Sequence, residues 1–375
     1  MPVGKGPLPK AERLRVSPGQ TENIRLTVAF AESYALIVSR RPDGRRTQDA
    51  ADADIGRVSF FRQSGLQYAR RIIFYGRNHT MTATPIFQGA ATALITPMNA
   101  SGVDYGQLGR LLDWQVEQGI DAIVIAGTTG EGSTLTDEEH REVLKFSAER
   151  VAGRVPMIAG TGSNDTAYAI ELSRFACDLN YDGLLVVTPY YNKTTQKGLI
   201  AMYNAIADEC TAPLIVYNVP SRTGVNIEPA TYAEIVKHPM ITGIKEAGGN
   251  ISKIVETASL IGDQAYIYSG DDDQVVPIMS MGGRGVISVV SNLMPKRVHD
   301  MCAAWFEGNV TEAARMQCEM IPLCRSLFCE TNPIPVKAAM AAMGWCENYL
   351  RLPLVPMEEA HAEVLYARMR EFGLI

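Results

Sequence analysis

One lysine, Lys245, ends an apolar segment in which its amine could act as a nucleophile. It follows Ile241-Thr242-Gly243-Ile244, a run expected to form a buried strand. Burial disfavours the ammonium form and leaves more neutral amine, which is the form that attacks a carbonyl carbon to give an imine. A lysine at a strand end is more often a rim residue whose charge reaches solvent. Tyr217, at the end of the preceding expected strand, favours the catalytic interpretation because its hydroxyl could carry protons to and from the intermediate.

A glycine-rich segment, Gly127-Thr128-Thr129-Gly130-Glu131-Gly132, follows another expected strand. Its glycines permit a sharp turn that exposes backbone amides, and its two threonines add hydroxyls, so the segment could bind a carboxylate. The alternative is a turn that only leads into the next helix. A phosphate-binding loop fits less well because the lysine of that motif is absent.

Two further strand ends carry polar side chains. One reads Thr188-Pro189-Tyr190-Tyr191-Asn192, and the other reads Tyr217-Asn218-Val219-Pro220-Ser221-Arg222-Thr223-Gly224. A tyrosine in such a place is often a core residue with its hydroxyl at the rim, and Arg222 could be an ordinary surface cation. Their proximity to the expected strand of Lys245 favours a shared site.

Short apolar runs alternate with amphipathic segments from residue 88 onward. Runs that are apolar on both faces and separated by helices are typical of parallel strands covered on both sides. Eight such units fit a (β/α)8 barrel better than a doubly wound sheet, and such barrels place their chemistry at the C-terminal strand ends. The expected strands are residues 90–96, 122–126, 157–160, 183–188, 214–218, 242–245, 265–269 and 285–289.

Only helical patterns follow the last expected strand. They cover residues 296–307, 311–326, 335–343 and 357–372, which is more than one closing helix requires. We therefore expect a catalytic barrel at residues 81–308 and a C-terminal helical subdomain at residues 309–375. Within the barrel, Thr136 before Asp137-Glu138-Glu139 predicts a capped helix start.

Residues 1–80 differ in composition from the rest of the chain. They contain 14 basic and 7 acidic residues, whereas the remainder contains 21 and 34. They show no sustained helix or strand period. The segment could be translated sequence upstream of a start at Met81, a disordered arm or a targeting peptide, in that order of preference, because its acidic residues disfavour a targeting peptide. The acidic remainder argues against a nucleic-acid-binding surface.

The residue types and their spacing also indicate whether a cofactor or a membrane is involved. The five histidines have no metal-ligand spacing, and the seven cysteines include no CxxC pair, so we expect neither a metal nor a disulfide framework. No apolar run is long enough to span a bilayer, and no signal-peptide pattern is present. We expect a cytoplasmic protein.

Taken together, the motifs resemble those of the dihydrodipicolinate synthase family, within the class I pyruvate-dependent lyase and aldolase superfamily. The resemblance covers residues 85–375 and rests on segments 127–131, 190–192, 217–224, 243–246 and 285–288, with Asn332-Pro333-Ile334-Pro335-Val336-Lys337 beyond them. It implies that pyruvate, held as a Schiff base without another cofactor, condenses with L-aspartate 4-semialdehyde to give 4-hydroxy-tetrahydrodipicolinate for lysine biosynthesis. It also implies a homotetramer built from two dimers.

The resemblance implies a role for each matching residue. Lys245 carries the Schiff base, and Thr129 and Tyr217 form a proton relay that Tyr191 completes from a partner subunit. The other implied contacts bind substrate, with Arg222 receiving the carboxylate of the semialdehyde. The substrate-binding residues are Thr128, Thr129, Arg222, Ile287, Gly270 and Asp271.

Two other functions compete with this interpretation. Sialic acid lyases and keto-deoxy sugar acid lyases share the lysine and the tyrosine, but they typically lack a Ser-Arg-Thr-Gly segment such as 221–224 and favour Ser-Thr over Thr-Thr in the glycine-rich loop. A non-catalytic binding paralogue would need neither Lys245 nor the tyrosines.

A lysine effector site is implied by the same resemblance. Strongly inhibited relatives carry a glutamate where this chain has Tyr168, so we expect weak or absent feedback inhibition, although Asp137 could supply a substitute charge. The implied effector residues are Ser133, His140, Asn164, Tyr168 and Tyr190.

Overall fold

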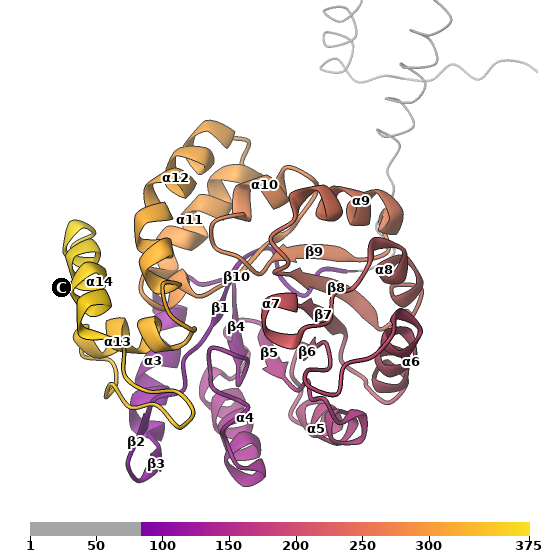
Figure 1. Ribbon diagram of the computed structural model, residues 1–375, viewed down its shortest axis with the longest axis horizontal. Coiled ribbons are helices and arrows are strands. Elements are labelled where there is room, and N and C mark those ends of the chain that lie inside the picture. Colours follow the sequence, from indigo (N-terminus) through magenta and orange to yellow (C-terminus); the bar gives the residue numbers. More distant parts are fainter. Residues whose placement is uncertain (1–83) are drawn as a thin grey trace, which may run out of the picture. The chain divides into compact units, whose positions relative to one another are not determined.

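A closed barrel of eight parallel strands forms the centre of the described part of the chain (Figure 1). The computed structural model describes residues 84–375, so the expectations for residues 1–80 lie outside the described part. Neighbouring strands follow the order β1-β10-β9-β8-β7-β6-β5-β4, which confirms the (β/α)8 fold. The barrel strands are β1 (Gly89–Ala93), β4 (Ala122–Ile125), β5 (Met157–Gly160), β6 (Gly183–Val187), β7 (Leu214–Asn218), β8 (Ile241–Glu246), β9 (Tyr266–Ser269) and β10 (Gly285–Ser288).

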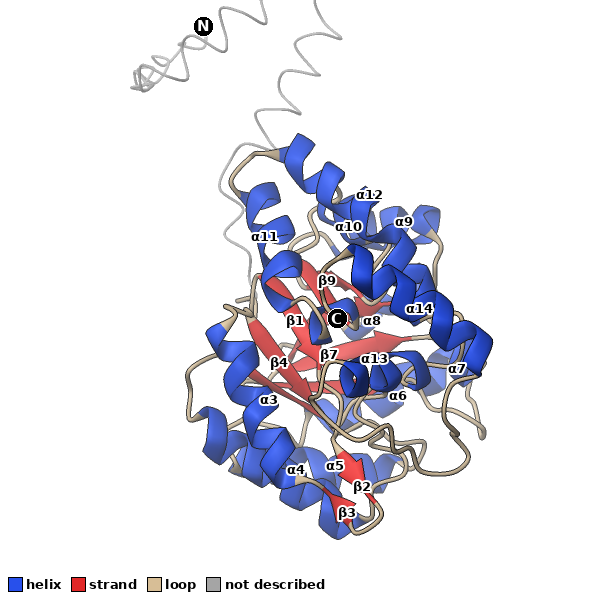
Figure 2. Ribbon diagram, turned by 90° about the vertical axis from the view of Figure 1, so that its left-hand side faces the viewer, coloured by secondary structure: helices blue, strands red, loops and turns tan. Residues whose placement is uncertain are grey.

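Helices surround the barrel on the outside, and a short antiparallel pair, β2 (Met98–Asn99) and β3 (Gly102–Val103), precedes the first of them (Figure 2). The helices that accompany the strands are α3 (Tyr105–Glu117), α4 (Asp137–Val151), α5 (Thr166–Asp178), α6 (Gln196–Ala207), α7 (Pro220–Thr223), α8 (Pro229–Ile235), α9 (Ile251–Ile261), α10 (Val275–Met279) and α11 (Pro295–Phe306). A 3-10 turn, η1 (Val290–Asn292), follows β10. As predicted, Thr136 caps α4: its side chain accepts from the Glu139 amide, and the Glu139 side chain accepts in return from the Thr136 amide.

Strand boundaries predicted from the sequence agree with the structure to within one residue, except at the end of β1. That strand ends at Ala93 rather than at residue 96. The Ile95 amide donates to Asn292 Oδ1 at 3.0 Å instead of to a neighbouring strand, and Pro97 has no amide hydrogen to donate. The chain therefore leaves the barrel earlier than its apolar pattern indicates.

Side chains of each strand alternate between the barrel interior and the layer under the helices. In β7, Ile215 and Tyr217 belong to the interior apolar cluster. Leu214 and Val216 belong to the larger cluster between barrel and helices. An interior-facing residue near the C-terminal end of a strand therefore reaches the mouth of the barrel.

A one-residue register shift between β7 and β8 decides which side chains face that mouth. Thr242 is the extra residue, and after it Tyr217 lies opposite Lys245. Without the shift, Ile244 would pair with Tyr217 and Lys245 would point under the helices. Such bulges redirect side chains in barrels, and here the bulge brings the lysine and the tyrosine to the same face.

Four helices follow β10, as the sequence predicts. The first, α11, packs against β1, and it also packs against α12 (Val310–Leu327). Two more, α13 (Ile334–Ala342) and α14 (Glu359–Glu371), pack against each other and against α12 (Figure 1). A domain boundary between residues 308 and 309 stays a prediction.

Within residues 84–375, no helix combines the length and the apolar character that a membrane span requires. The same part of the chain contains no group of three or more His, Cys, Asp or Glu side chains arranged to hold a metal ion.

Candidate active site

Lys245 and Tyr217 face each other at the mouth of the barrel. The two residues pair directly across β7 and β8, and Lys245 Nζ lies 4.3 Å from the centroid of the Tyr217 ring. Lys245 is only 6% exposed, and burial lowers the pKa of its amine to about 8, although Asp271 and Asp272 act in the opposite direction. A sizeable fraction of the amine is therefore neutral near pH 8, as a nucleophile requires.

Tyr217 stays protonated at neutral pH. Burial raises the pKa of its hydroxyl to about 12, partly offset by Arg222 and by a hydrogen bond with the Thr128 side chain.

The expected neighbour of this hydroxyl was Thr129. Thr129 Oγ1 instead accepts a hydrogen bond of 3.0 Å from Asn332 Nδ2. The two threonines are adjacent in the chain and contact different groups, Thr128 the Tyr217 hydroxyl and Thr129 the Asn332 side chain. The relay role expected for Thr129 stays a prediction.

A cavity of about 150 Å³ opens beside Lys245. Its size suits a molecule of a few carbon atoms together with part of a second one. Seven residues predicted from the sequence meet in its wall, drawn from four strand ends and the loops that follow them. These are Thr128, Thr129, Tyr217, Arg222, Lys245, Gly270 and Asp271.

Arg222 stands at the open side of this cavity, in the short helix α7. One of its guanidinium nitrogens, Nη2, donates to the Asn332 carbonyl oxygen at 2.8 Å. Asn332 thus touches both Arg222 and Thr129 and also lines the cavity. Within residues 84–375 its Oδ1 atom is buried and has no hydrogen-bond partner, so an acceptor is available there. The sequence placed Asn332 in a family-like motif, which was a signal, but gave it no role.

The loop after β9 adds carboxylates and a close backbone approach. Burial raises the pKa of Asp271 to about 6, and the nearby Asp273 adds to the effect. Asp272 is buried and accepts from Ser288 Oγ at 2.5 Å and from the Val289 amide at 2.8 Å. A Cβ atom on Gly270 would lie 2.7 Å from Ala247 Cβ and 3.0 Å from the Glu246 carbonyl oxygen, so a side chain could enter only if these neighbours moved.

Two predicted residues lie outside the cavity wall. Ile287, in β10, is fully buried in the interior apolar cluster that also contains Tyr217. Tyr191 is 92% exposed and has a positive φ of 68°, so its side chain stands free of this chain's own cavity. The expectation that it enters a partner's site stays a prediction.

Known proteins resemble this chain over most of its described part. The family described as "Dihydrodipicolinate synthetase family" matches residues 86–371, nearly all of the described part of the chain. The chain belongs to this family. The match begins after the N-terminal segment that the sequence set apart.

Individual members of the dihydrodipicolinate synthetase family match over nearly their whole length. The chain is 51% identical over 292 residues to a "4-hydroxy-tetrahydrodipicolinate synthase" of Thermoanaerobacter sp. strain X514, covering 78% of this chain and 98% of the relative. It is 48% identical over 291 residues to the protein of that name from Acetivibrio thermocellus, covering 78% and 99%. The solved dihydrodipicolinate synthase of Thermotoga maritima is 42% identical, with a TM-score of 0.76, and the match covers 78% of this chain and all of that one.

The residues expected to bind an effector are partly engaged with other groups in this family member. Tyr168 donates its hydroxyl to Asp137 Oδ1 at 2.8 Å, and Asp137 Oδ2 also accepts from Arg141 at 2.9 Å. His140 is buried, with Nε2 3.0 Å from the Gly160 carbonyl oxygen. Of the others, Ser133 is exposed, and Asn164 and Tyr190 are half-buried.

A buried ion pair ties the glycine-rich loop to helix α13. Lys337 Nζ lies 2.5 Å from Glu131 Oε1, and both side chains are at most 1% exposed. Lys337 also donates to the Tyr349 carbonyl oxygen at 2.7 Å. Glu131 closes the loop that holds Thr128 and Thr129, so this pair links the C-terminal helices to the cavity wall.

We expect Lys337→Met to lower the free energy of unfolding by about 3–5 kcal/mol, because it leaves the Glu131 carboxylate buried without its partner. Urea denaturation followed by circular dichroism measures the change. The double variant Glu131→Leu with Lys337→Met removes both charges and should recover much of the loss. A single variant within about 1 kcal/mol of the unchanged chain would contradict this account of the pair.

Proposed function

We propose that the chain is a lyase that condenses pyruvate with L-aspartate 4-semialdehyde to give 4-hydroxy-tetrahydrodipicolinate, in the diaminopimelate route to lysine. The relatives named for this activity support the assignment, because they are 51% and 48% identical to this chain. The single observation that supports the mechanism is the buried Lys245 amine facing Tyr217 in a small cavity. The proposed chemistry requires no cofactor beyond the covalent Schiff base.

In the first half-reaction, the neutral Lys245 amine attacks the keto carbon of pyruvate. The resulting carbinolamine must lose its oxygen as water, so a proton has to reach that oxygen. Tyr217 is protonated and lies beside the amine, and its contact with Thr128 offers a path for returning the proton. The amides and hydroxyls of the loop around Thr128 and Thr129 are suited to hold the pyruvate carboxylate.

In the second half-reaction, the methyl carbon of the bound pyruvate loses a proton and bonds to the aldehyde carbon of the second substrate. The amino group of that substrate then attacks the imine carbon and displaces Lys245, which closes the ring. Arg222, at the open side of the cavity, is positioned to bind the carboxylate of this substrate. Asn332 Oδ1 and Asp271 are available to accept from its polar hydrogens.

A sugar-acid lyase is the second candidate, since it would use the same lysine and tyrosine. Arg222 supports the synthase assignment because a sugar aldehyde has no carboxylate near its reacting carbon. The Thr128-Thr129 pair supports it as well. A non-catalytic paralogue is disfavoured because a binding protein gains nothing from burying the amine of Lys245.

Product analysis tests the proposal. Purified protein is incubated with pyruvate and L-aspartate 4-semialdehyde, and the products are identified by mass spectrometry. The expected product has the summed mass of the two substrates less one water. Condensation of pyruvate with N-acetylmannosamine or a keto-deoxy sugar precursor, and none with the semialdehyde, would favour the second candidate.

The assembly and location of the protein are further parts of the proposal. We propose a homotetramer of two dimers in which Tyr191 of one subunit enters the site of its neighbour. The high exposure of the Tyr191 ring supports this, because its side chain is free to enter a neighbouring subunit's site. A cytoplasmic location stays a prediction.

We expect the proposed activity to be insensitive to L-lysine at submillimolar concentration. Asp137 is the nearby carboxylate that could replace the missing glutamate, but Arg141 and Tyr168 already bind it. Loss of a charged contact lowers the affinity for lysine by about 10- to 100-fold. An activity titration against lysine measures the effect. Half-inhibition at a lysine concentration below about 1 mM would contradict the expectation.

A further inference from the structure

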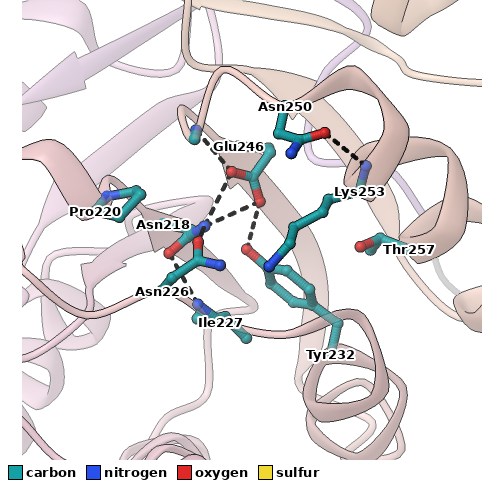
Figure 3. Close-up of a pocket in the computed structure, with 10 residues that line it drawn as sticks. Asn218, Pro220, Asn226, Ile227, Tyr232, Glu246, Asn250, Lys253 and Thr257 are labelled. Carbon is teal, nitrogen blue, oxygen red and sulfur yellow. Dashed lines mark hydrogen bonds between the residues drawn. The ribbon is translucent and has the colours of Figure 1, made fainter.

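A second cavity lies behind the strands that carry Lys245 and Tyr217. Its volume is about 250 Å³, and it lies beside the C-terminal ends of β7 and β8 and helices α8 and α9 (Figure 3). The residues that line it are Asn218, Pro220, Asn226, Ile227, Tyr232, Glu246, Gly248, Asn250, Lys253 and Thr257. Neither Lys245 nor Tyr217 is among them, because these two side chains face the other cavity.

Strand register explains why the two cavities share a wall. Asn218 directly follows Tyr217, Glu246 directly follows Lys245, and the two pairs are successive rungs of the β7–β8 ladder. Side chains alternate along a strand, so the rung that carries the amine faces the barrel mouth and the next one faces the helices. Asn218 and Glu246 therefore sit one residue behind the proposed chemistry.

Glu246 is the centre of a hydrogen-bond network in this second cavity (Figure 3). Its Oε1 atom accepts from the Gly248 amide at 2.8 Å and from Asn218 Nδ2 at 3.0 Å. Its Oε2 atom accepts from the Tyr232 hydroxyl at 2.7 Å, and Asn218 Nδ2 is also 3.3 Å from Oε2. Asn218 Oδ1 in turn accepts from the Ile227 amide at 3.2 Å. One buried carboxylate thus joins β7, β8, α8 and the loop after β8.

Every group that contacts Glu246 in this network donates to it. A carboxylate accepts on both oxygens, whereas an amide or a protonated acid must donate from one position, so the network fits the ionised side chain. Burial raises the pKa of Glu246, while the bonds from Tyr232 and Asn218 favour its charged form. A buried charge is costly unless its oxygens are fully hydrogen-bonded. The network around Glu246 therefore does more than fill space.

We propose that Glu246 is a positioning residue: with Asn218 it holds the ends of β7 and β8 together and so fixes the spacing between Lys245 and Tyr217. The inference rests on the proposed Schiff-base function. It follows from the register, because any displacement of the Asn218–Glu246 rung is passed directly to the rung before it. A misplacement of about 1 Å between reacting groups lowers a rate by roughly 100-fold.

Glu246→Gln tests the role while retaining the size of the side chain. The amide can accept on one oxygen only, so at least one bond to Gly248, Asn218 or Tyr232 is lost. We expect kcat for the condensation to fall roughly 10- to 100-fold, with KM for pyruvate changed less than about threefold. Rates are expressed per active site, counted by borohydride trapping of the pyruvate imine, so that unfolded protein does not contribute.

Tyr232→Phe provides a milder second variant, since it removes one donor and leaves the carboxylate and the ring. It should lower kcat by a smaller factor in the same direction. Glu256→Gln is the matched control: this exposed carboxylate lies on α9, the helix that carries Lys253, and is not among the residues that line the cavity. Its kcat should equal that of the unchanged protein.

The outcomes separate the inference from the function on which it rests. If the unchanged protein does not trap pyruvate, the proposed function fails. If it does trap pyruvate and Glu246→Gln keeps an unchanged kcat per trapped site, the positioning role is contradicted. If Glu246→Gln does not fold, the Tyr232→Phe variant decides, and an unchanged kcat per site in that variant contradicts the role.

Discussion

Replacing Lys245 by alanine should abolish turnover with pyruvate and L-aspartate 4-semialdehyde while leaving the barrel folded. The amine is the group that forms the covalent bond in the proposed mechanism, and among residues 84–375 no other lysine lines the cavity. Loss of a catalytic nucleophile lowers kcat by orders of magnitude, roughly 10³-fold or more. Steady-state kinetics measure the loss, and circular dichroism checks the fold.

The control for this variant is Lys237→Ala. Lys237 is an exposed lysine close in sequence, paired with Glu234 on the surface. Its removal should change kcat by less than about twofold, as surface substitutions away from a site do. A Lys245→Ala variant that kept more than about a tenth of the original kcat would show that another group carries the chemistry.

Arg222→Ala should raise KM for L-aspartate 4-semialdehyde roughly 10- to 100-fold while KM for pyruvate changes little. The guanidinium stands at the open side of the cavity with one nitrogen bound to the Asn332 carbonyl. Its other donors are suited to hold a carboxylate in two parallel hydrogen bonds. Losing a charge-assisted contact costs about 1.5–3 kcal/mol, which corresponds to this change in affinity.

Arg222→Lys separates charge from geometry. A lysine keeps the positive charge but cannot form the paired contact, so KM for the semialdehyde should lie between those of the unchanged protein and the alanine variant. An equal rise of both KM values in Arg222→Ala would mean that Arg222 supports the cavity as a whole and does not select the second substrate.

The sequence was sufficient to predict the barrel because each strand is short, apolar on both faces and followed by a helix. It was also sufficient for the residues near the strand ends, since parallel strands bring their C-terminal ends to one place. Lys245, Tyr217, Arg222 and Asp271 therefore meet in the structure as expected.

The features that could not be predicted from the sequence depend on tertiary contacts. The bulge at Thr242 turns Lys245 toward Tyr217, and no local pattern marks which residue of the strand is the extra one. Thr128 and Thr129 have the same side chain, so only their surroundings show which of them meets Tyr217. Asn332 comes from a helical region about 200 residues beyond the glycine-rich loop, and only tertiary packing reveals its contact with Thr129.

Reductive trapping followed by peptide mapping tests the central claim most directly. The protein is incubated with pyruvate, the imine is reduced with borohydride, and the digested chain is analysed by mass spectrometry. The mechanism predicts one pyruvate-derived adduct, on the peptide that contains Lys245, at close to one per chain. An adduct on a different lysine, or no adduct on a folded protein that consumes pyruvate, would contradict it.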